Sequence, residues 1–313
     1  MKCSNWHEYK EEDNWEDILV KFDYLIVGNH FEIDDRCSFL GNKFRMHNKK
    51  IYQFKVTYPS SSNPNLYPCF FLDEAEITIN DLNSFINHIE SNNFHILLDI
   101  STFDLPELYH FLDSCNEVLS SACIAYSEPK VYTKEDVKDN SGGEYLLSKD
   151  GNGIDYLSSC DILPSLSKRY LISIGYESHR LAGFLSSDEI QMEDRKSVIL
   201  GVPPFNVGWE HHTIKNNYKI LDKHSVSLHI APADDPVQTY LKVFKVYQEL
   251  KERQNLVLMP IGPKPQALGM IWFAINKNTG SVPEVGVQYD FVQKIQKRTS
   301  GISKVHLWSF KFK

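Results

Sequence analysis

Apolar runs of strand length alternate along the chain with stretches whose apolar residues recur at helical spacing, and this pattern predicts strands that alternate with helices. Asn80–Ser91, for example, begins with an asparagine cap and keeps its apolar residues on one face. Residues 1–20 are predicted to be a polar lead-in. The strands predicted in the first half are Phe22–Gly28, Ile51–Tyr58, Phe94–Ile100 and Ser121–Ser127.

The same pattern restarts after Thr133–Lys168, a charged segment with several glycines that is predicted to be a linker or a mobile segment. We therefore expect a first half over residues 1–132, a linker over 133–168 and a second half over 169–313. The strands predicted in the second half are Tyr170–Gly175, Ser197–Pro203, Ser225–Ala231, Leu256–Ile261 and Lys304–Phe310.

The order of the predicted elements is similar in the two halves. In each half the first strand is followed by a glutamate, an arginine and a short helix that ends in Phe-Leu. Each half later has a helix, a buried strand, a second helix and a closing strand. We therefore predict an α/β protein of two similar Rossmann-like halves with mainly parallel sheets, an internal duplication that makes the chain a pseudo-dimer. The alternative is one continuous mixed sheet without internal symmetry.

The segment Asn255–Ile275 combines a buried strand, a sharp Gly-Pro-Lys-Pro turn and an apolar helix. The turn follows the carboxyl end of its strand, which is where open α/β sheets bind ligands. The N–H groups at the start of a helix suit an anion, and the lysine adds a full charge. We therefore predict that Gly262, Pro263, Lys264 and Gln266 bind a ligand. The alternative is an ordinary turn with a solvated lysine.

Polar side chains follow several of the other predicted strands, and the carboxyl ends of the two halves are expected to face a shared cleft. Arginine offers phosphate two parallel hydrogen bonds, and serine and threonine add single ones. Each glutamate–arginine pair has an alternative interpretation, a structural ion pair that orders the turn after its strand. These further candidate ligand residues are Glu32, Arg36, Ser101, Thr102, Glu177 and Arg180.

A loop stiffened by two prolines precedes Trp209 and the adjacent residues His211 and His212. Neighbouring residues on a helix point about 100° apart, so these histidines are badly placed to share a metal, and no metal site is predicted. Trp209 is predicted to form a pocket wall on which a base or another ring stacks. Plain packing of this side chain is the alternative.

Composition and charge narrow the classes of function. The net charge is −8 and no long basic run occurs, so direct nucleic-acid binding is not predicted. The N-terminus is acidic and lacks the apolar stretch of a signal peptide, and no apolar run approaches the length of a membrane span. The six cysteines form no C-x-x-C pair and are interpreted as reduced thiols. We therefore expect a cytoplasmic protein without a membrane partner.

A strand followed by Gly-[Thr/Pro]-Lys-Pro and an apolar helix is similar to a motif of CARF domains, the Rossmann-like sensors of cyclic oligonucleotides in bacterial defence. SAVED domains resemble two CARF-like units fused in one chain, as the repeat suggests here. Pro263 replaces the more usual threonine, and the first half has Ser101 and Thr102 without a lysine. The resemblance implies a nucleotide or cyclic-oligonucleotide-like ligand and a protein effector as partner.

Two functions from different classes fit these observations. We expect a sensor or regulatory subunit of a bacterial anti-phage defence complex, which binds a nucleotide-type ligand, needs no cofactor and signals to a partner effector. The alternative is an enzyme that acts on a nucleotide, nucleic acid or phosphorylated substrate in the cleft between the halves. Lys264, Arg36 and Arg180 would then hold phosphate and a carboxylate would act as base. A structural component of a larger complex is a third interpretation.

Overall fold

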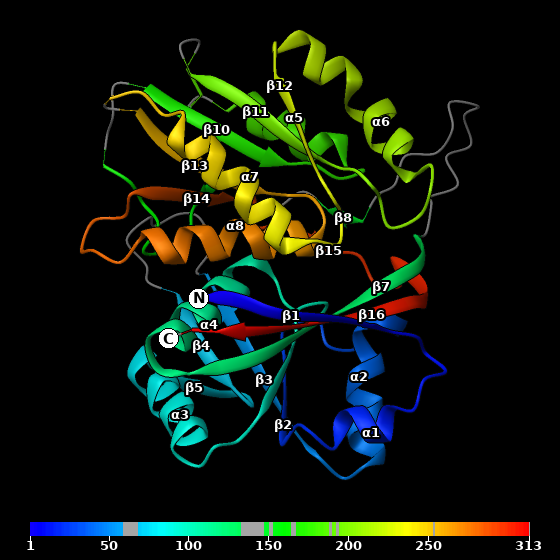
Figure 1. Cartoon of the computed structure of the whole chain (residues 1–313). Helices are drawn as coiled ribbons and strands as arrows, with labels where there is room; N and C mark the ends of the chain where they lie inside the picture. Colours follow the sequence, from blue (N-terminus) through cyan, green and yellow to red (C-terminus); the bar gives the residue numbers. More distant parts are fainter. Residues whose placement is uncertain are drawn as a thin grey trace. The chain divides into compact units, whose positions relative to one another are not determined.

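The structure, a computed structural model, describes residues 1–58, 68–132, 147–149, 153–163, 167–187, 190–191, 194–252 and 254–312. The chain forms two compact units. The first unit comprises Met1–Thr133 and Ile295–Lys313, and the second comprises Lys134–Lys294. Both units combine helices with a large sheet, which confirms the predicted α/β class (Figure 1).

The sheet of the first unit has the strand order β1-β16-β7-β6-β2-β3-β4-β5. Its centre, β3-β2-β6-β7, is parallel, and antiparallel strands extend it on both sides. The strands are β1 (Lys2–Tyr9), β2 (Tyr24–Val27), β3 (Lys50–Thr57), β4 (Cys69–Leu72), β5 (Ala75–Ile77), β6 (Ile96–Asp99), β7 (Ser121–Tyr132) and β16 (Thr299–Lys311). The helices are α1 (Trp15–Leu19), α2 (Asp35–Met46), α3 (Ile79–Ser91) and α4 (Leu105–Val118).

Caps and apolar faces explain why these helices form where they do. Asp34 accepts a hydrogen bond from the backbone N–H of Cys37 at the start of α2. Thr78 and Asp81 form a reciprocal capping box at the start of α3. The apolar side of α2, with Leu40 and Phe44, is buried in a cluster that also includes side chains of α1 and β2. Burial of this face fixes the position of the loop that follows β2.

The main sheet of the second unit has the order β12-β11-β10-β13-β14-β9, and β15 and β8 form a separate pair. Its first five strands are parallel. The strands are β8 (Ser148–Lys149), β9 (Asp155–Tyr156), β10 (Ser167–Ser173), β11 (Arg195–Gly201), β12 (Ser227–Ala231), β13 (Gln254–Pro260), β14 (Val285–Tyr289) and β15 (Gln293–Lys294). The helices are α5 (Ser178–Leu185), α6 (Trp209–Lys223), α7 (Pro236–Gln248) and α8 (Lys264–Lys277).

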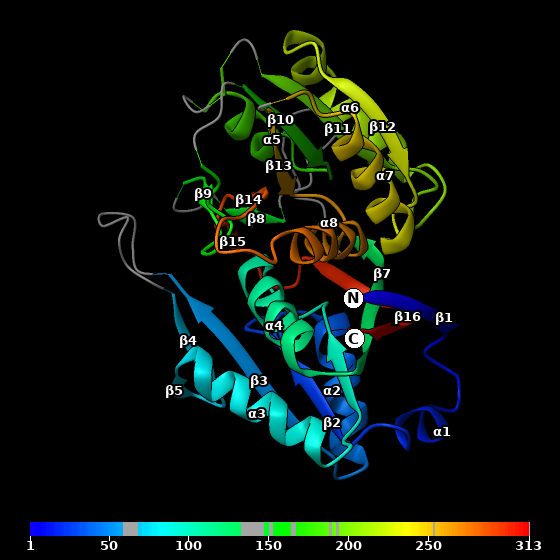
Figure 2. The same cartoon turned by 60° about the vertical axis from the view of Figure 1, so that its left-hand side comes forward.

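Helices cover both faces of this second sheet. Leu181, Phe184 and Leu185 of α5 pack with Tyr170 and Ile172 of β10 in one core cluster. The helices α7 and α8 lie on the opposite face (Figures 1 and 2). The result is a doubly wound sheet, the arrangement in which a parallel sheet is shielded from water on both sides.

The two units share the order of four parallel strands. In the first unit this order is β3-β2-β6-β7, and in the second it is β11-β10-β13-β14. In both, the chain first adds a strand on one side and then crosses to the other. The internal duplication itself stays a prediction.

Two sequence predictions differ from the structure. Lys304–Phe310 does not close the second half, because β16 pairs with β7 in the first unit. The second unit instead ends its parallel series with β14, which contains Gly286; a Cβ there would lie 2.7 Å from the ring of Tyr156. Residues 1–20 are not simply a polar lead-in, because β1 pairs with β16 through backbone groups that need no apolar pattern.

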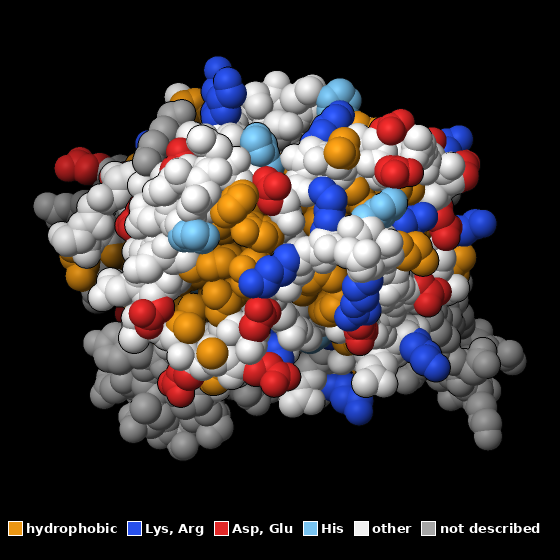
Figure 3. All heavy atoms as spheres, turned by 90° about the horizontal axis from the view of Figure 1, so that it is seen from below, with side chains coloured by type: hydrophobic (Ala, Val, Ile, Leu, Met, Phe, Trp, Pro, Cys, Tyr) orange, Lys and Arg blue, Asp and Glu red, His pale blue; other side chains and the backbone are white. Residues whose placement is uncertain are grey.

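Much of the predicted linker lies outside the described residues, at 133–146, 150–152 and 164–166. Its described part includes β9, which pairs with β14 in the second sheet. No helix in the described part of the chain has both the length and the apolar character of a membrane span. The face seen in Figure 3 mixes basic and acidic side chains and shows no continuous basic stripe.

Candidate ligand-binding site at the strand-order reversal of the second unit

The strand order of the second unit reverses between β10 and β13. From β10 the chain adds β11 and β12 on one side, and it then returns to add β13 and β14 on the other. The loops that leave β10 and β13 therefore diverge at the carboxyl edge of the sheet. Open α/β sheets bind their ligands in the crevice at such a point. The predicted Gly262 turn is the loop that leaves β13.

Gly262 brings the turn very close to the backbone of the neighbouring strand. A Cβ on Gly262 would lie 2.9 Å from the carbonyl oxygen of Ile174 and 3.0 Å from its nitrogen. The Gly262 N–H donates a hydrogen bond of 3.2 Å to the Ser173 hydroxyl. The backbone of Gly262 has no positive φ, so close approach, rather than a left-handed conformation, requires glycine here.

The helix α8 begins directly in this turn. Pro263 is its N-cap and Lys264 is its first residue. Pro265 follows at a position where a helix leaves its N–H unpaired, so proline costs no hydrogen bond there. Lys264 is half-buried, whereas the ten residues after Pro265 are buried. The start of a helix and a lysine thus occupy the strand-order reversal, as the sequence predicts.

Gln266 anchors the first turn of α8. Its Nε2 donates hydrogen bonds to the carbonyl oxygens of Ala231 (3.1 Å), the last residue of β12, and of Pro232 (3.4 Å). Carbonyl oxygens only accept, so these bonds fix which side-chain atom is the nitrogen. The other atom, Oε1, is buried and accepts no hydrogen bond from the residues that the structure describes. Gln266 therefore joins the Gly262 turn to the end of β12.

Arg180 and Glu177 connect three loops at the same edge. Arg180 forms two hydrogen bonds with Asp290 and a longer one, of 3.4 Å, with the carbonyl oxygen of Ile261. Glu177 lies 3.6 Å from Arg180 and accepts hydrogen bonds from Ser148. Glu177 and Arg180 thus form the structural ion pair that the sequence analysis gave as the alternative to ligand binding. Arg180 therefore positions the Gly262 turn, and a direct contact with ligand stays a prediction.

Trp209 lies beside the loop that leaves β10. Its ring packs edge-on against Tyr176, with ring centroids 6.1 Å apart. Two side chains of α6, Asn216 and Asn217, donate hydrogen bonds of 2.9 Å to the carbonyl oxygens of Tyr176 and Gly175. The structure thus brings Trp209 to one loop of the reversal and holds that loop against α6. Stacking of a ligand on this ring stays a prediction.

The corresponding reversal in the first unit, between β2 and β6, is closed by its own loops. The Thr102 hydroxyl accepts a hydrogen bond of 2.7 Å from the N–H of Gly28, and the Thr102 carbonyl accepts one of 2.9 Å from His30. A Cβ on Gly28 would lie 2.6 Å from the Cα of Phe103. The Ser101 hydroxyl accepts a hydrogen bond from Ser127. Both predicted hydroxyls are fully buried in these contacts.

Arg36 and Glu32 do not meet in the first unit. Glu32 pairs with Arg45 at the surface, at 2.6 Å. Arg36 is buried, lies 3.6 Å from Asp34 and donates a hydrogen bond of 3.1 Å to the hydroxyl of Tyr126. The predicted pair is thus replaced by two separate ion pairs.

Asp34 forms a hydrogen bond and ion pairs with side chains that the sequence analysis did not connect to it. Thr299 donates a hydrogen bond of 2.6 Å to its carboxylate, and Arg298 lies 3.7 Å away. Burial alone would raise the pKa of Asp34, but Arg36, the hydrogen bonds from Thr299 and Cys37, and Arg298 together lower it below its usual value. Thr299 and Arg298 follow the second unit in the chain, so no pattern of neighbouring residues in the sequence connects them to Asp34.

Comparison with known proteins adds one distant similarity. No protein-family model matches the chain. Glutamate–tRNA ligase 2 of Sulfurimonas denitrificans (strain ATCC 33889 / DSM 1251) is 21% identical over 240 residues, which cover 72% of this chain and 55% of that protein. The chain thus spans about half the length of this curated relative. This identity does not assign the chain to a family.

Proposed function

We propose that the second unit binds a nucleotide-type anionic ligand at the reversal between β10 and β13. One observation carries the proposal: Gly262 allows the start of α8, with Lys264 as its first residue, to approach the end of β10 at the strand-order reversal. Backbone N–H groups at a helix start and a lysine ammonium both favour phosphate. The corresponding reversal in the first unit has no lysine in its loops, and Gly28 and Thr102 are in direct contact there.

The surroundings of the turn support a rigid binding site. Arg180 and Gln266 connect the turn to the ends of β14 and β12, so the anion-binding groups are held by the scaffold before a ligand arrives. Such preorganisation lowers the entropy cost of binding. The ring pair of Tyr176 and Trp209 adds an aromatic surface at the neighbouring loop, which suits the base of a nucleotide.

Titration calorimetry against a panel of mononucleotides, dinucleotides and cyclic oligonucleotides tests the proposal. We expect at least one of these ligands to bind the wild-type protein, and Lys264→Ala to weaken its binding. Lys277→Ala is the matched control, because Lys277 lies in the last turn of the same helix, about 20 Å from Lys264 at the rise of an α-helix. Absence of heat across the panel for folded protein would refute the proposal.

The resemblance to CARF and SAVED domains extends this proposal to signalling. We propose that the ligand-bound chain reports to a separate effector protein and acts as a regulatory subunit in bacterial defence. Co-purification of the chain from a native host, with and without the ligand found in the panel, tests this extension. A partner whose binding depends on the ligand and on Lys264 is the expected outcome, and a partner that binds equally to Lys264→Ala contradicts it.

A second candidate function is an enzyme that acts on a nucleotide or nucleic acid. The observation that favours it is the similarity to a protein named as a glutamate–tRNA ligase. Incubation of the chain with nucleotides, or with tRNA, glutamate and Mg²⁺, followed by product analysis, separates the two functions. A new product that disappears in Lys264→Ala supports the enzyme, and unchanged substrates support the binding subunit.

A further inference from the structure

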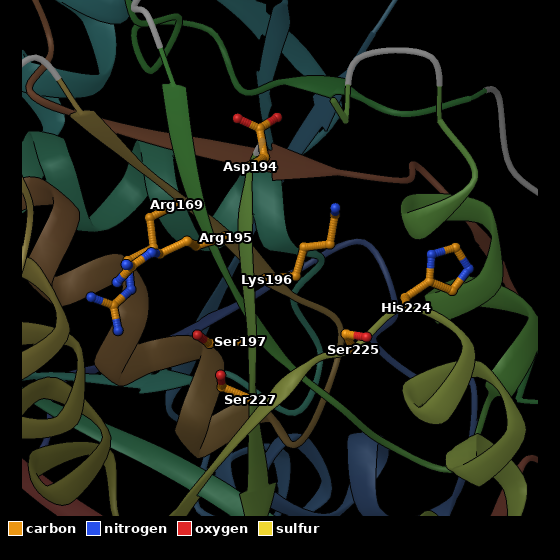
Figure 4. Close-up of a pocket in the computed structure, with 8 residues that line it drawn as sticks. All are labelled: Arg169, Asp194, Arg195, Lys196, Ser197, His224, Ser225 and Ser227. Carbon is orange, nitrogen blue, oxygen red and sulfur yellow. The ribbon is translucent and has the colours of Figure 1, made fainter. Parts of the chain in front are cut away.

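The amino ends of β10, β11 and β12 surround a pocket of about 360 Å³ in the second unit. It lies at the opposite edge of the sheet from the Gly262 turn, because all three strands run parallel to β13 or to its neighbours. The side chains around it are drawn in Figure 4. Ligands of open α/β sheets bind at the carboxyl edge, so the proposed function does not account for this pocket.

The strand register places two arginines and two serines side by side at this pocket. Arg169 of β10 lies opposite Arg195 of β11, and Ser197 of β11 lies opposite Ser227 of β12. Residues two apart on a strand share a face, so Arg195 and Ser197 point to the same side. Figure 4 shows Lys196 on the other side of β11. Three cations thus gather around the amino end of one strand.

The acidic groups nearby are already occupied by protein contacts. Glu249 accepts a hydrogen bond of 3.0 Å from Nη2 of Arg169. The two oxygens of Asp194 accept the backbone N–H groups of Lys168 and Gln191, at 2.7 and 2.9 Å. Three basic side chains therefore lie near two carboxylates. One of these carboxylates, Asp194, already accepts backbone N–H groups with both of its oxygens.

Arg169 is the strongest sign that an anion belongs here. It is only 6% exposed, and its Nε has no hydrogen-bond partner among the residues that the structure describes. A buried guanidinium donor without an acceptor is costly, and a nearby oxyanion can offset that cost. Burial lowers the pKa of His224 at the pocket wall, and the charges of Lys223 and Lys196 lower it further.

We propose that this pocket is a second anion site, which binds the phosphate groups of a small phosphorylated molecule. Arg195 would supply a planar fork for two phosphate oxygens, and Ser197 and Ser227 hydroxyl donors; Lys196, on the other side of β11, adds positive charge without a direct contact. The volume exceeds that of a single phosphate, so the ligand class is a phosphorylated metabolite or a diphosphate. The site is independent of the one at Lys264, because the two lie at opposite edges of the sheet.

Binding of pyrophosphate and of inorganic phosphate at constant ionic strength tests this site. We expect calorimetry to detect pyrophosphate binding, and the amide resonances of Ser197 and Ser227 to shift on its addition. The double variant Arg195→Gln/Lys196→Gln should weaken this binding by at least about tenfold, since it removes the charge-assisted contact of Arg195 and a second nearby positive charge. Ser197→Ala, which changes no charge, should weaken it by a smaller factor.

Lys215→Gln/Lys219→Gln is the matched control, because it removes the same charge from exposed positions on α6 that do not line the pocket. Equal weakening in this control would show that net charge alone drives binding and would overturn the site. Failure of folded wild-type protein to bind pyrophosphate would overturn it as well. Weakening by Lys264→Ala, but not by the pocket variants, would place the anion at the carboxyl edge, which contradicts this site and supports the proposed function.

Discussion

Arg180 donates two hydrogen bonds to the carboxylate of Asp290, from Nε to Oδ2 and from Nη2 to Oδ1, each 2.6 Å long. The pair joins α5 to the loop after β14, and the remaining nitrogen of Arg180 reaches the carbonyl oxygen of Ile261, next to the Gly262 turn. One buried guanidinium thus sets the distance between three loops of the candidate site. An arginine fork with all of its nitrogens in use holds a scaffold more readily than it holds a phosphate.

Asp290→Asn should destabilise the protein strongly. The change is nearly isosteric, but it leaves the buried charge of Arg180 with only the more distant Glu177, at 3.6 Å. Breaking one side of a buried ion pair costs about 3–5 kcal/mol, and we expect the lower end because Glu177 remains. Urea unfolding followed by circular dichroism measures the loss. Asp222→Asn, an exposed change on α6, is the control, and a loss below about 1 kcal/mol in Asp290→Asn would show that the pair is dispensable.

The local parts of the fold were predictable from the sequence, because caps and apolar periodicity are local signals. The Gly262 turn is the clearest case, since a glycine between a buried strand and an apolar helix has few other interpretations. The alternation also predicted the α/β class. The starts of α3 and α8 lie close to where Asn80 and the proline-rich turn indicated.

The partners within the candidate sites were not predictable in this way. Asp290 is separated from Arg180 by 110 residues, and Thr299 from Asp34 by 265. Such contacts depend on the strand order, which the sequence pattern does not determine. For the same reason Lys304–Phe310 was assigned to the wrong sheet: its apolar pattern shows that it is a strand but not which strand it pairs with.

The stability of the first unit should depend on pH through His110. Burial lowers the pKa of this histidine to about 4, from an ordinary value of 6.5. Between these values the unfolded chain binds a proton that the folded chain does not, so stability falls as pH decreases from 6.5 toward 4. The shift corresponds to about 3 kcal/mol.

Asp113, on the same helix, acts in the opposite direction. Burial, and after it the charge of Glu117, raise its pKa from 3.8 to about 6. The folded chain then holds the extra proton, so the contribution of Asp113 to the stability of the protein falls as pH rises from about 4 to 6. We therefore expect a nearly flat stability profile for the wild-type protein between pH 4 and 6. In urea unfolding, Asp113→Asn should become more stable with rising pH and His110→Asn less stable; parallel profiles for the two variants would contradict this assignment.

Gly262→Ala should lower both stability and ligand binding. The added Cβ would lie 2.9 Å from a backbone oxygen, so the turn must move away from β10. Overpacking of this kind costs about 1–3 kcal/mol. Gly183→Ala is the matched control: it lies in α5, and a Cβ there meets no atom within 4 Å, so alanine should stabilise the protein by about 0.5–1 kcal/mol. Thermal unfolding of both variants measures the contrast, and equal shifts would mean that the turn is not held by close approach.

Lys264→Ala distinguishes a role of Lys264 in ligand binding from a role in the stability of the turn. If the start of α8 binds an anion, this change removes one charge-assisted contact, which is worth about 1.5–3 kcal/mol. Affinity for the ligand should then fall roughly tenfold to a hundredfold, because each 1.4 kcal/mol is a factor of ten. Stability should change less than binding does, since Lys264 lies at the edge of the turn and alanine is a good helix former. Calorimetry and urea unfolding of the same preparation measure the two quantities, with Lys277→Ala as the control. A variant that binds ligand normally but unfolds more easily would show that Lys264 stabilises the turn, and the function of the second unit would then have to be sought at its other edge.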